Sequence, residues 1–106
     1  VELTKDADWR VRYAAVQSLG RWSDGRAKEQ IAPLISDSMP YVRMISVWAL
    51  AQIGDKESIP KIIEATNDPS RDVRNSAQLA LLNMSQTGEP RDTSGWKSWW
   101  EKNKGK

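Results

Sequence analysis

Residues 41–54, YVRMISVWALAQIG, set the pattern of the chain, because their register occurs once before and once after them at an interval of 31 residues. The flanking copies are VRYAAVQSLGRW, residues 11–22, and VRNSAQLALLNM, residues 73–84. The strongest matches are Asp6/Asp37/Asp68, Val11/Val42/Val73, Arg12/Arg43/Arg74 and Leu19/Leu50/Leu81. Three copies at one interval indicate a repeat protein, in which stacked units share a core and present an extended binding surface.

Each copy contains apolar and small residues at helical spacing, which predicts long helices over about residues 8–22, 41–53 and 71–84. Shorter helices are predicted before the second and third of these, over about residues 27–36 and 57–66. Since two antiparallel helices cannot bury both faces alone, each pair should stack on its neighbours. The residues expected to point inward are Val11, Ala15, Ser18, Leu19, Trp22, Ile31, Leu34, Ile35, Val42, Ser46, Ala49, Leu50, Ile53, Ile59, Ile62, Ile63, Ala65, Val73, Ala77, Ala80, Leu81 and Met84.

Prolines, glycines and aspartates mark the helix ends. Pro33 lies inside a short helix and predicts a kink or a late start, whereas Pro60 falls in a first turn, where a missing amide hydrogen costs little. Gly54 should end the middle long helix. Asp24 is expected to cap the helix over residues 27–36.

The two ends of the chain depart from the repeat. Val1–Lys5 align with the closing residues of a short helix, so we expect the array to start in mid-repeat, as the C-terminal piece of a longer protein. An incomplete first repeat would leave Val11, Ala15 and Leu19 partly uncovered, which predicts self-association through an open N-terminal end. The whole chain, residues 1–106, is expected to form one domain.

The C-terminal segment is predicted as a loop over residues 86–95 followed by a helix over residues 96–103. Trp96, Trp99 and Trp100 lie at helical spacing, and three indoles could cover the apolar end of the array. Stacking of a ligand on these rings is the alternative interpretation. The lysines at positions 97, 102, 104 and 106 are expected to form a solvated tail.

Composition removes several function classes. The chain has no histidine and no cysteine, which excludes thiol nucleophiles, zinc clusters and imidazole bases, and no cofactor or metal is expected. Residues 1–88 carry 11 basic and 11 acidic side chains, which argues against a surface that follows nucleic-acid phosphates. No long apolar run indicates a membrane span, and no signal-peptide pattern occurs at the N-terminus.

The aspartate and arginine ladders allow two interpretations. Regularly spaced guanidinium groups could bind an acidic ligand. Alternatively, each arginine, six residues after an aspartate, could bridge adjacent turns and satisfy their backbone carbonyls. We favour the structural interpretation, because every aspartate falls in a turn and every arginine in the first turn of a long helix.

These motifs resemble those of a known family. The segments DADWRVRYAAVQSLGRWSD, DSMPYVRMISVWALAQIGD and DPSRDVRNSAQLALLNMSQ are similar to HEAT-like repeats of the bilin-lyase type, and the ending WKSWWEKNK resembles the closing segment of bacterial HEAT-repeat proteins. The resemblance implies an all-α fold, a right-handed α-solenoid in which the helices that carry Val-Arg line a concave, protein-docking side. It does not imply bilin-lyase activity.

The resemblance also carries exclusions. Deoxyhypusine hydroxylases have similar repeats but bind iron through His-Glu pairs, which a chain without histidine cannot form. HEAT-like DNA glycosylases share only the fold, and the neutral charge of the repeats weighs against them. The expected function is therefore a non-catalytic scaffold for protein–protein interaction.

The outward stripe of the long helices supplies the candidate binding residues. An exposed apolar patch with a polar rim is typical of an interaction hot spot. The alternative is that Trp48 and Met44 pack locally, against each other or an upstream repeat. A second function, nucleic-acid binding through Arg10, Arg21 and the C-terminal lysines, is less favoured. The predicted partner-binding residues are Tyr13, Gln17, Tyr41, Met44, Trp48, Gln52 and Leu79.

Overall fold

The computed structural model describes residues 5–22, 27–85 and 92–105, apart from the side chain of Trp22. Within these ranges the chain is helical and contains no strand. Helix α6 is followed by a short turn at Lys104 and Gly105. The elements are α1 (Trp9–Trp22), α2 (Lys28–Ile31), the 3₁₀ helix η3 (Ala32–Ser36), α3 (Pro40–Ile53), the 3₁₀ helix η4 (Lys56–Ser58), α4 (Ile59–Ala65), α5 (Arg71–Ser85) and α6 (Thr93–Asn103).

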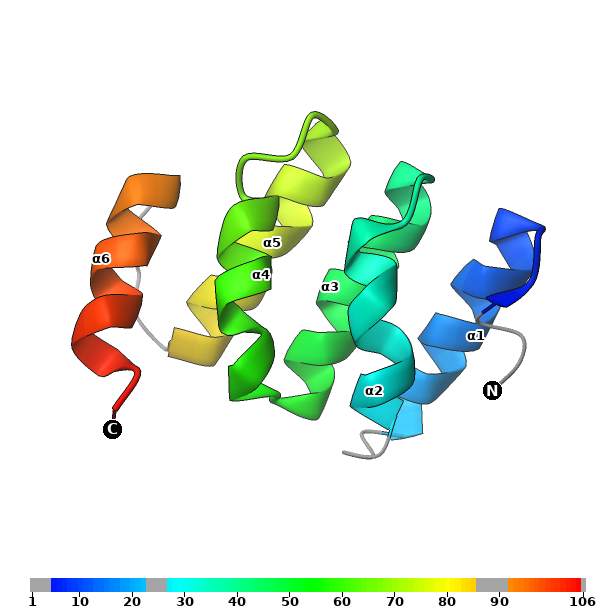
Figure 1. Cartoon of the computed structure of the whole chain (residues 1–106), viewed down its shortest axis with the longest axis horizontal. Coiled ribbons are helices and arrows are strands. Elements are labelled where there is room, and N and C mark those ends of the chain that lie inside the picture. Colours follow the sequence, from blue (N-terminus) through cyan, green and yellow to red (C-terminus); the bar gives the residue numbers. More distant parts are fainter. Residues whose placement is uncertain (1–4, 23–26, 86–91, 106) are drawn as a thin grey trace.

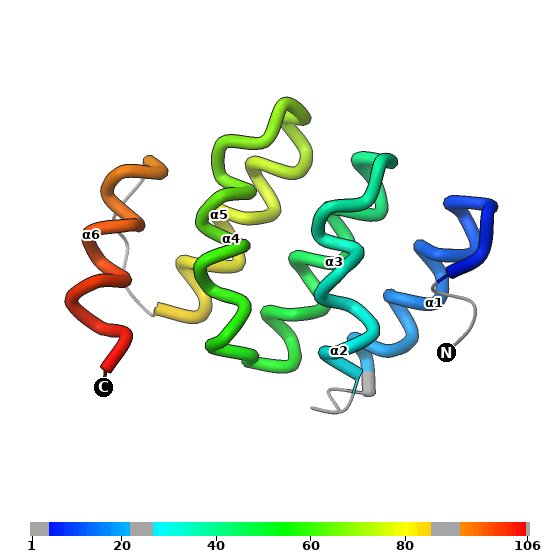
Figure 2. Tube along the Cα trace, in the orientation of Figure 1, coloured from blue at the N-terminus to red at the C-terminus, as the bar shows by residue number. Residues whose placement is uncertain are grey.

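The helices form two layers (Figure 1). The long helices α1, α3 and α5 lie side by side in one layer, and α2 with η3, α4 and α6 form the other. The tube in Figure 2 shows that the connections from the second layer into α3 and α5 lie along one edge of the molecule. The all-helical repeat array predicted from the sequence is thus present.

The predicted helix signals act where expected. The first short helix changes from α to 3₁₀ geometry at Ala32, one residue before Pro33. Pro33 has no amide hydrogen and cannot donate the hydrogen bond that would continue the α-helix. Pro40 and Pro60 lie in the first turns of α3 and α4, where this loss costs little. Gly54 ends α3 with φ of 76°, a left-handed conformation that glycine adopts without strain.

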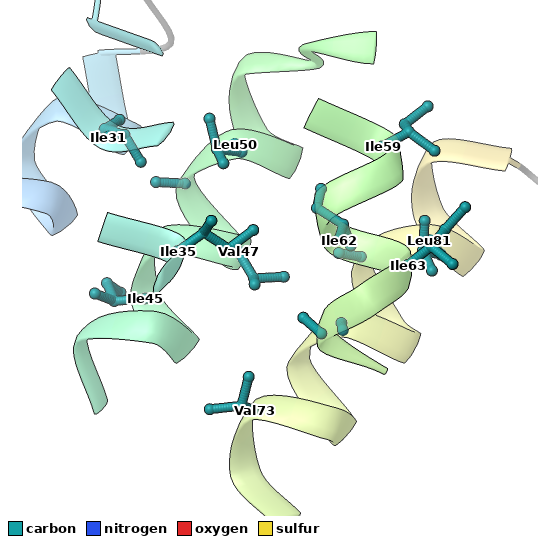
Figure 3. Packing of buried hydrophobic residues seen from close by; sticks show 14 of the residues in the cluster. Ile31, Ile35, Ile45, Val47, Leu50, Ile59, Ile62, Ile63, Val73 and Leu81 are labelled. Atoms are coloured by element: carbon teal, nitrogen blue, oxygen red, sulfur yellow. The ribbon is translucent and has the colours of Figure 1, made fainter. Parts of the chain in front are cut away.

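The core lies between the two layers and is continuous from α1 to α6. Leu50, predicted to point inward, is fully buried on α3, and Figure 3 shows it among isoleucines of the second layer. The predicted inward residues of α3, α4 and α5 are buried, except that Ile53 and Met84 are half-buried. Leu34 of η3 is also half-buried and packs against the core.

The inward stripe of α1 was only partly correct. Ser18 was predicted to point inward, but it is exposed, although the equivalent residues Ala49 and Ala80 are buried. The difference arises because α3 and α5 each have a preceding long helix on this side, whereas α1 has none among the described residues. Of the three residues expected to be partly uncovered, Val11 and Leu19 are half-buried, whereas Ala15 is buried.

The long helices also bury residues on their sides that the predicted inward stripe does not include. Val16 and Val47 are fully buried, and Ile45 is nearly so. A helix with neighbours on both sides and a second layer below it buries a wider arc than the single stripe predicted from periodicity. This widening explains why α3 is buried over most of its circumference.

The aspartate and arginine ladders join consecutive repeats, which confirms their structural interpretation. Arg12 donates through Nε and Nη2 to both carboxylate oxygens of Asp37, each at 3.0 Å, and through Nη1 to the carbonyl of Asp6 at 2.8 Å. Arg43 holds Asp68 in the same way, at 2.9 and 3.0 Å, and the carbonyl of Asp37 at 2.8 Å. Each arginine thus ties its own turn to the turn of the next repeat.

Helix α6 departs from the repeat in both its start and its direction. It begins at Thr93, so the predicted loop, which ran to Gly95, was too long. The Asp92 carboxylate caps the helix by accepting a hydrogen bond from the Gly95 amide at 2.7 Å. Thr93 meets Thr66 at the end of α4, so α6 runs antiparallel to α4 (Figure 1). The predictions for residues 1–4, for Asp24 and for residues 86–91 lie outside the described residues.

Candidate protein-binding face

The outer side of α1, α3 and α5 carries the predicted binding residues. Two neighbouring helix starts place aromatic rings next to each other there. Trp9 opens α1 and Tyr41 follows Pro40 at the start of α3; their ring centroids lie 5.6 Å apart with an angle of 29° between the planes. Tyr41 remains 47% exposed in this stack, so an aromatic surface is available to a partner.

An open groove of about 400 Å³ lies beside this stack. We call it the aromatic groove. Its lining is largely apolar, with one guanidinium at the rim, which is the composition of a site for an apolar side chain of a partner. The lining residues are Trp9, Arg10, Tyr13, Tyr41 and Met44.

Arg10 is held at the rim by Asp8. Its Nη2 lies 3.2 Å from Asp8 Oδ2, and its amide also donates to Asp8 Oδ1 at 3.0 Å. The hydrogen bonds from Arg10 hold the pKa of the Asp8 carboxyl below its usual value, and the same contact raises the pKa of Arg10. The side chain of Arg10 is 75% exposed, so an arginine–aspartate ion pair stands at the edge of the groove.

The structure brings together three of the seven predicted residues, Tyr13, Tyr41 and Met44, in one groove. Gln52 and Leu79 are exposed on the same helix layer but do not line the groove, and Gln17 is half-buried. Trp9 and Arg10 were missed as members of the site. The separation of Trp9 from Tyr13 by four residues on α1 is the signal that could have identified Trp9.

Trp48 lies deeper than its place on the outward stripe suggested. It is half-buried and packs against the core. A Cβ placed on Gly20 of α1 would lie 2.8 Å from Cζ3 of the Trp48 ring, so the indole fits against the space left by this glycine. Part of Trp48 therefore contributes to packing between α1 and α3.

The basic residues of the alternative function do not lie together. Arg10 and Arg21 belong to α1, at one end of the array, and the described lysines belong to α6 and its end, at the other (Figure 1). Arg10 is paired with Asp8, and Lys104 with Glu101 at 2.9 Å. Among the described residues, these side chains therefore form no continuous basic track of the kind that follows nucleic-acid phosphates.

The tryptophans of α6 divide into two kinds. Trp96 is fully buried, and its indole Nε1 donates to Gln78 Oε1 at 2.8 Å. Trp99 and Trp100 are half-buried and line a hollow of about 520 Å³ between α6 and the ends of α3 and α5. Trp96 thus has a packing role, while two rings remain partly accessible.

Over residues 5–22, 27–85 and 92–105, no group of three or more carboxylates could hold a metal ion. In the same ranges, none of the helices combines the length and apolar character needed to cross a bilayer.

The two-layered helical array with its arginine-bridged turns defines a helical repeat protein. Comparison with protein families gives the particular family: the family model for HEAT repeats matches residues 1–82, and the chain belongs to this family. HEAT repeats commonly mediate protein–protein interaction and generally act as non-catalytic scaffolds. No curated protein matches the sequence.

Proposed function

We propose that the chain is a non-catalytic scaffold that binds a segment of another protein on the outer face of α1, α3 and α5. The observation that carries the proposal is the Trp9–Tyr41 stack, in which Tyr41 is exposed, beside an apolar groove. Solvent-exposed aromatic rings with a polar rim are the usual centre of a protein interface. Membership of the HEAT repeat family supports the proposal.

The groove would take an apolar side chain of the partner as its anchor. Tyr13 and Met44 would contact the anchor from the sides, and the ring of Tyr41 would cover it. The remaining predicted residues, Gln17, Trp48, Gln52 and Leu79, would extend the contact along α1, α3 and α5. The amide groups of Gln17 and Gln52 would form part of the polar rim of the interface.

Selection from a display library of random peptides tests the proposal. We expect selected peptides to share an apolar anchor residue and to lose about tenfold or more in affinity for the Tyr41→Ala variant, as for an interface hot spot. Tyr13→Ala should act in the same direction. Lys61→Ala, an exposed residue of α4 in the opposite layer, is the matched control and should leave affinity unchanged.

Circular dichroism of each variant separates loss of binding from loss of folding. Peptides that bind the folded Tyr13→Ala and Tyr41→Ala variants as tightly as the unmodified chain would show that the groove is not the site. Failure to select any peptide above background would argue against peptide binding altogether.

A further inference from the structure

The hollow between α6 and the ends of α3 and α5, which we call the α6 hollow, has the size of a ligand site. Its volume is about 520 Å³, within the usual range of such sites. Because α6 runs antiparallel to α4, its last turn lies beside the start of α4 and the end of α5 (Figure 1). The hollow shares no lining residue with the aromatic groove, so the two surfaces are separate.

Two tryptophans supply most of the apolar surface of the α6 hollow. Trp99 and Trp100 are half-buried, with ring centroids 6.3 Å apart and an angle of 37° between the planes. The buried ring of Trp96 meets Trp99 edge to face at 5.6 Å and supports it from the core. Ile59 and Met84 add aliphatic surface from α4 and α5. The hollow therefore suits a large apolar side chain.

The charged side chains that line the α6 hollow are both cationic. They are Lys56 of η4 and Lys104 after α6, and no aspartate or glutamate lines the hollow among the described residues. Lys104 pairs at 2.9 Å with Glu101, but both side chains are more than half exposed, so water screens this pair. The acidic neighbours on either side of Lys56 pair instead with Lys28 of the preceding short helix.

The helix ends around the hollow would by themselves favour a cation, because the last carbonyls of a helix carry partial negative charge. Several of these carbonyls already accept hydrogen bonds within the chain. The amide of Gly54 donates to Leu50 and Ala51 at the end of α3, at 3.0 and 3.1 Å, and the amide of Lys104 donates to Trp100 at 2.8 Å. Two full ammonium charges on a lining without carboxylates therefore favour an anion.

A ligand that fits both properties carries a carboxylate next to a large apolar side chain. An aspartate or glutamate within a protein brings the carboxylate but no apolar side chain on the same residue. The C-terminal residue of a protein can bring both, and capture of a terminal carboxylate is a known mode of peptide recognition. A protein ligand also agrees with membership of the HEAT repeat family, which commonly mediates protein–protein interaction.

We propose that the α6 hollow binds the C-terminal residue of another protein. The apolar side chain of that residue lies against Trp99 and Trp100, and its terminal carboxylate lies beside Lys56 and Lys104. The opening of the hollow lets the rest of the bound chain leave toward solvent. Because the site does not use the aromatic groove, either site can be absent without the other.

Two-dimensional NMR of the isotope-labelled chain tests the proposal, because each of the 6 tryptophans gives its own indole N–H signal. The probe is a short glycine–serine peptide that ends in phenylalanine with a free carboxylate. We expect it to shift the signals of Trp99 and Trp100 and to leave that of Trp9 in place. The amidated peptide, and a peptide that ends in serine, should each bind at least about tenfold more weakly.

Variants of the chain separate the two parts of the site. Lys56→Gln should weaken the carboxylate peptide about two- to fivefold, the range of an exposed ion pair, without effect on the amidated peptide. Lys102→Gln is the matched control, because Lys102 is an exposed lysine of α6 that does not line the hollow. Trp100→Ala should abolish binding, Tyr41→Ala should not change it, and circular dichroism checks that both variants are folded.

Several results would overturn the proposal. They are equal binding of the carboxylate and amidated peptides, shifts confined to tryptophans other than Trp99 and Trp100, and no binding of the carboxylate peptide up to about 1 mM. Free phenylpropanoate has the same ring and carboxylate without the peptide chain. If it bound as tightly as the peptide, the site would be one for a small acid and not for a protein C-terminus.

Discussion

Arg43 shows how much one side chain contributes to a repeat array. Its guanidinium makes four hydrogen bonds, two to the Asp68 carboxylate and two to the carbonyls of Asp37 and Ser38. The side chains of Arg43 and Asp68 are 16% and 11% exposed, so solvent screens this pair less than a surface ion pair. The fork therefore fixes the distance between two turns and the angle between them.

Replacement of Arg43 by lysine should destabilise the fold although the charge is kept. A lysine cannot form the planar fork or reach both carbonyls, and we expect the free energy of unfolding to fall by about 1.5–3 kcal/mol. Arg43→Ala, which leaves a largely buried carboxylate unpaired, should cost about 3–5 kcal/mol. Urea denaturation measures both, with the exposed Arg71→Lys as control; equal stability of Arg43→Lys and wild type would contradict the structural role.

Gly20 sets the closest approach between α1 and α3. A Cβ at this position would lie 2.8 Å from the Cβ and 3.1 Å from the Cα of Ala49, and backbone atoms cannot move aside cheaply. Overpacking of this kind costs about 1–3 kcal/mol, and the helix propensity of alanine offsets up to about 1 kcal/mol of it.

We therefore expect Gly20→Ala to lower the free energy of unfolding by up to about 2 kcal/mol, measured by urea denaturation. Ser18→Ala on the same helix is the control, because the Ser18 side chain is exposed and stability should stay constant or rise. A stabilised Gly20→Ala variant would show that α1 and α3 can separate without cost.

At the level of elements, a polar contact joins α6 to α5. Val16, Val47 and Gln78 occupy the same repeat position, and the two valines are fully buried in α1 and α3. In α5 the position is glutamine, whose Oε1 satisfies the indole N–H of the buried Trp96. We interpret α6 as the element that closes the array, with Trp96 as its anchor.

Substitution Gln78→Leu restores the apolar residue of the other repeats but leaves the Trp96 N–H without this acceptor. We expect a loss of about 1–3 kcal/mol, the cost of an unsatisfied buried donor. Trp96→Ala should cost more, about 3–5 kcal/mol, and should expose the amides of α4 to faster hydrogen exchange. Asn75→Leu is the matched control, because Asn75 is an exposed residue of the same helix and the change also replaces an amide by leucine. Gln78→Asp is not suitable as a control because it adds a charge. Unchanged stability of Gln78→Leu would show that water replaces the acceptor.

The elements also show the limits of sequence reasoning. Apolar spacing located every long helix to within one or two residues, because α1, α3 and α5 share one register and clear end signals. It could not reveal that α6 runs antiparallel to α4, since helical periodicity has no direction. The start of α6 at Thr93 depends on the Asp92 cap, which the loop-like composition of residues 86–95 concealed.

Across the whole molecule, one core connects both layers. Leu50 is fully buried near its centre, and we expect Leu50→Ala to lower the free energy of unfolding by about 2–5 kcal/mol. Thermal unfolding followed by circular dichroism should remain a single transition at a lower midpoint, because all repeats share this core. The exposed Leu79→Ala is the control, and an unchanged midpoint for Leu50→Ala would contradict its central position.

The candidate site was only partly predictable at this scale. The outward stripe identified Tyr13, Tyr41 and Met44, because helical geometry fixes which side each residue faces. It missed Trp9, whose counterparts in the other repeats are Pro40 and Arg71, so the repeat register assigns it no common role. The depth of Trp48 depends on Gly20 in a different helix, and such a contact is visible only when the helices are placed together.

The arginine forks lie along one edge of the array, where the second layer leads into α3 and α5. On the opposite edge, the ion pairs between repeats among the described residues are those of Lys28 with Asp55 and Glu57, at 3.7 and 3.8 Å. Bidentate arginine–aspartate pairs near 3.0 Å resist stretching more strongly than single, longer lysine–carboxylate contacts. The edge with the arginine forks should therefore be stiffer than the opposite edge. Under load the array would bend about the stiffer edge while the repeats separate at the opposite edge, so that its curvature changes in one preferred direction.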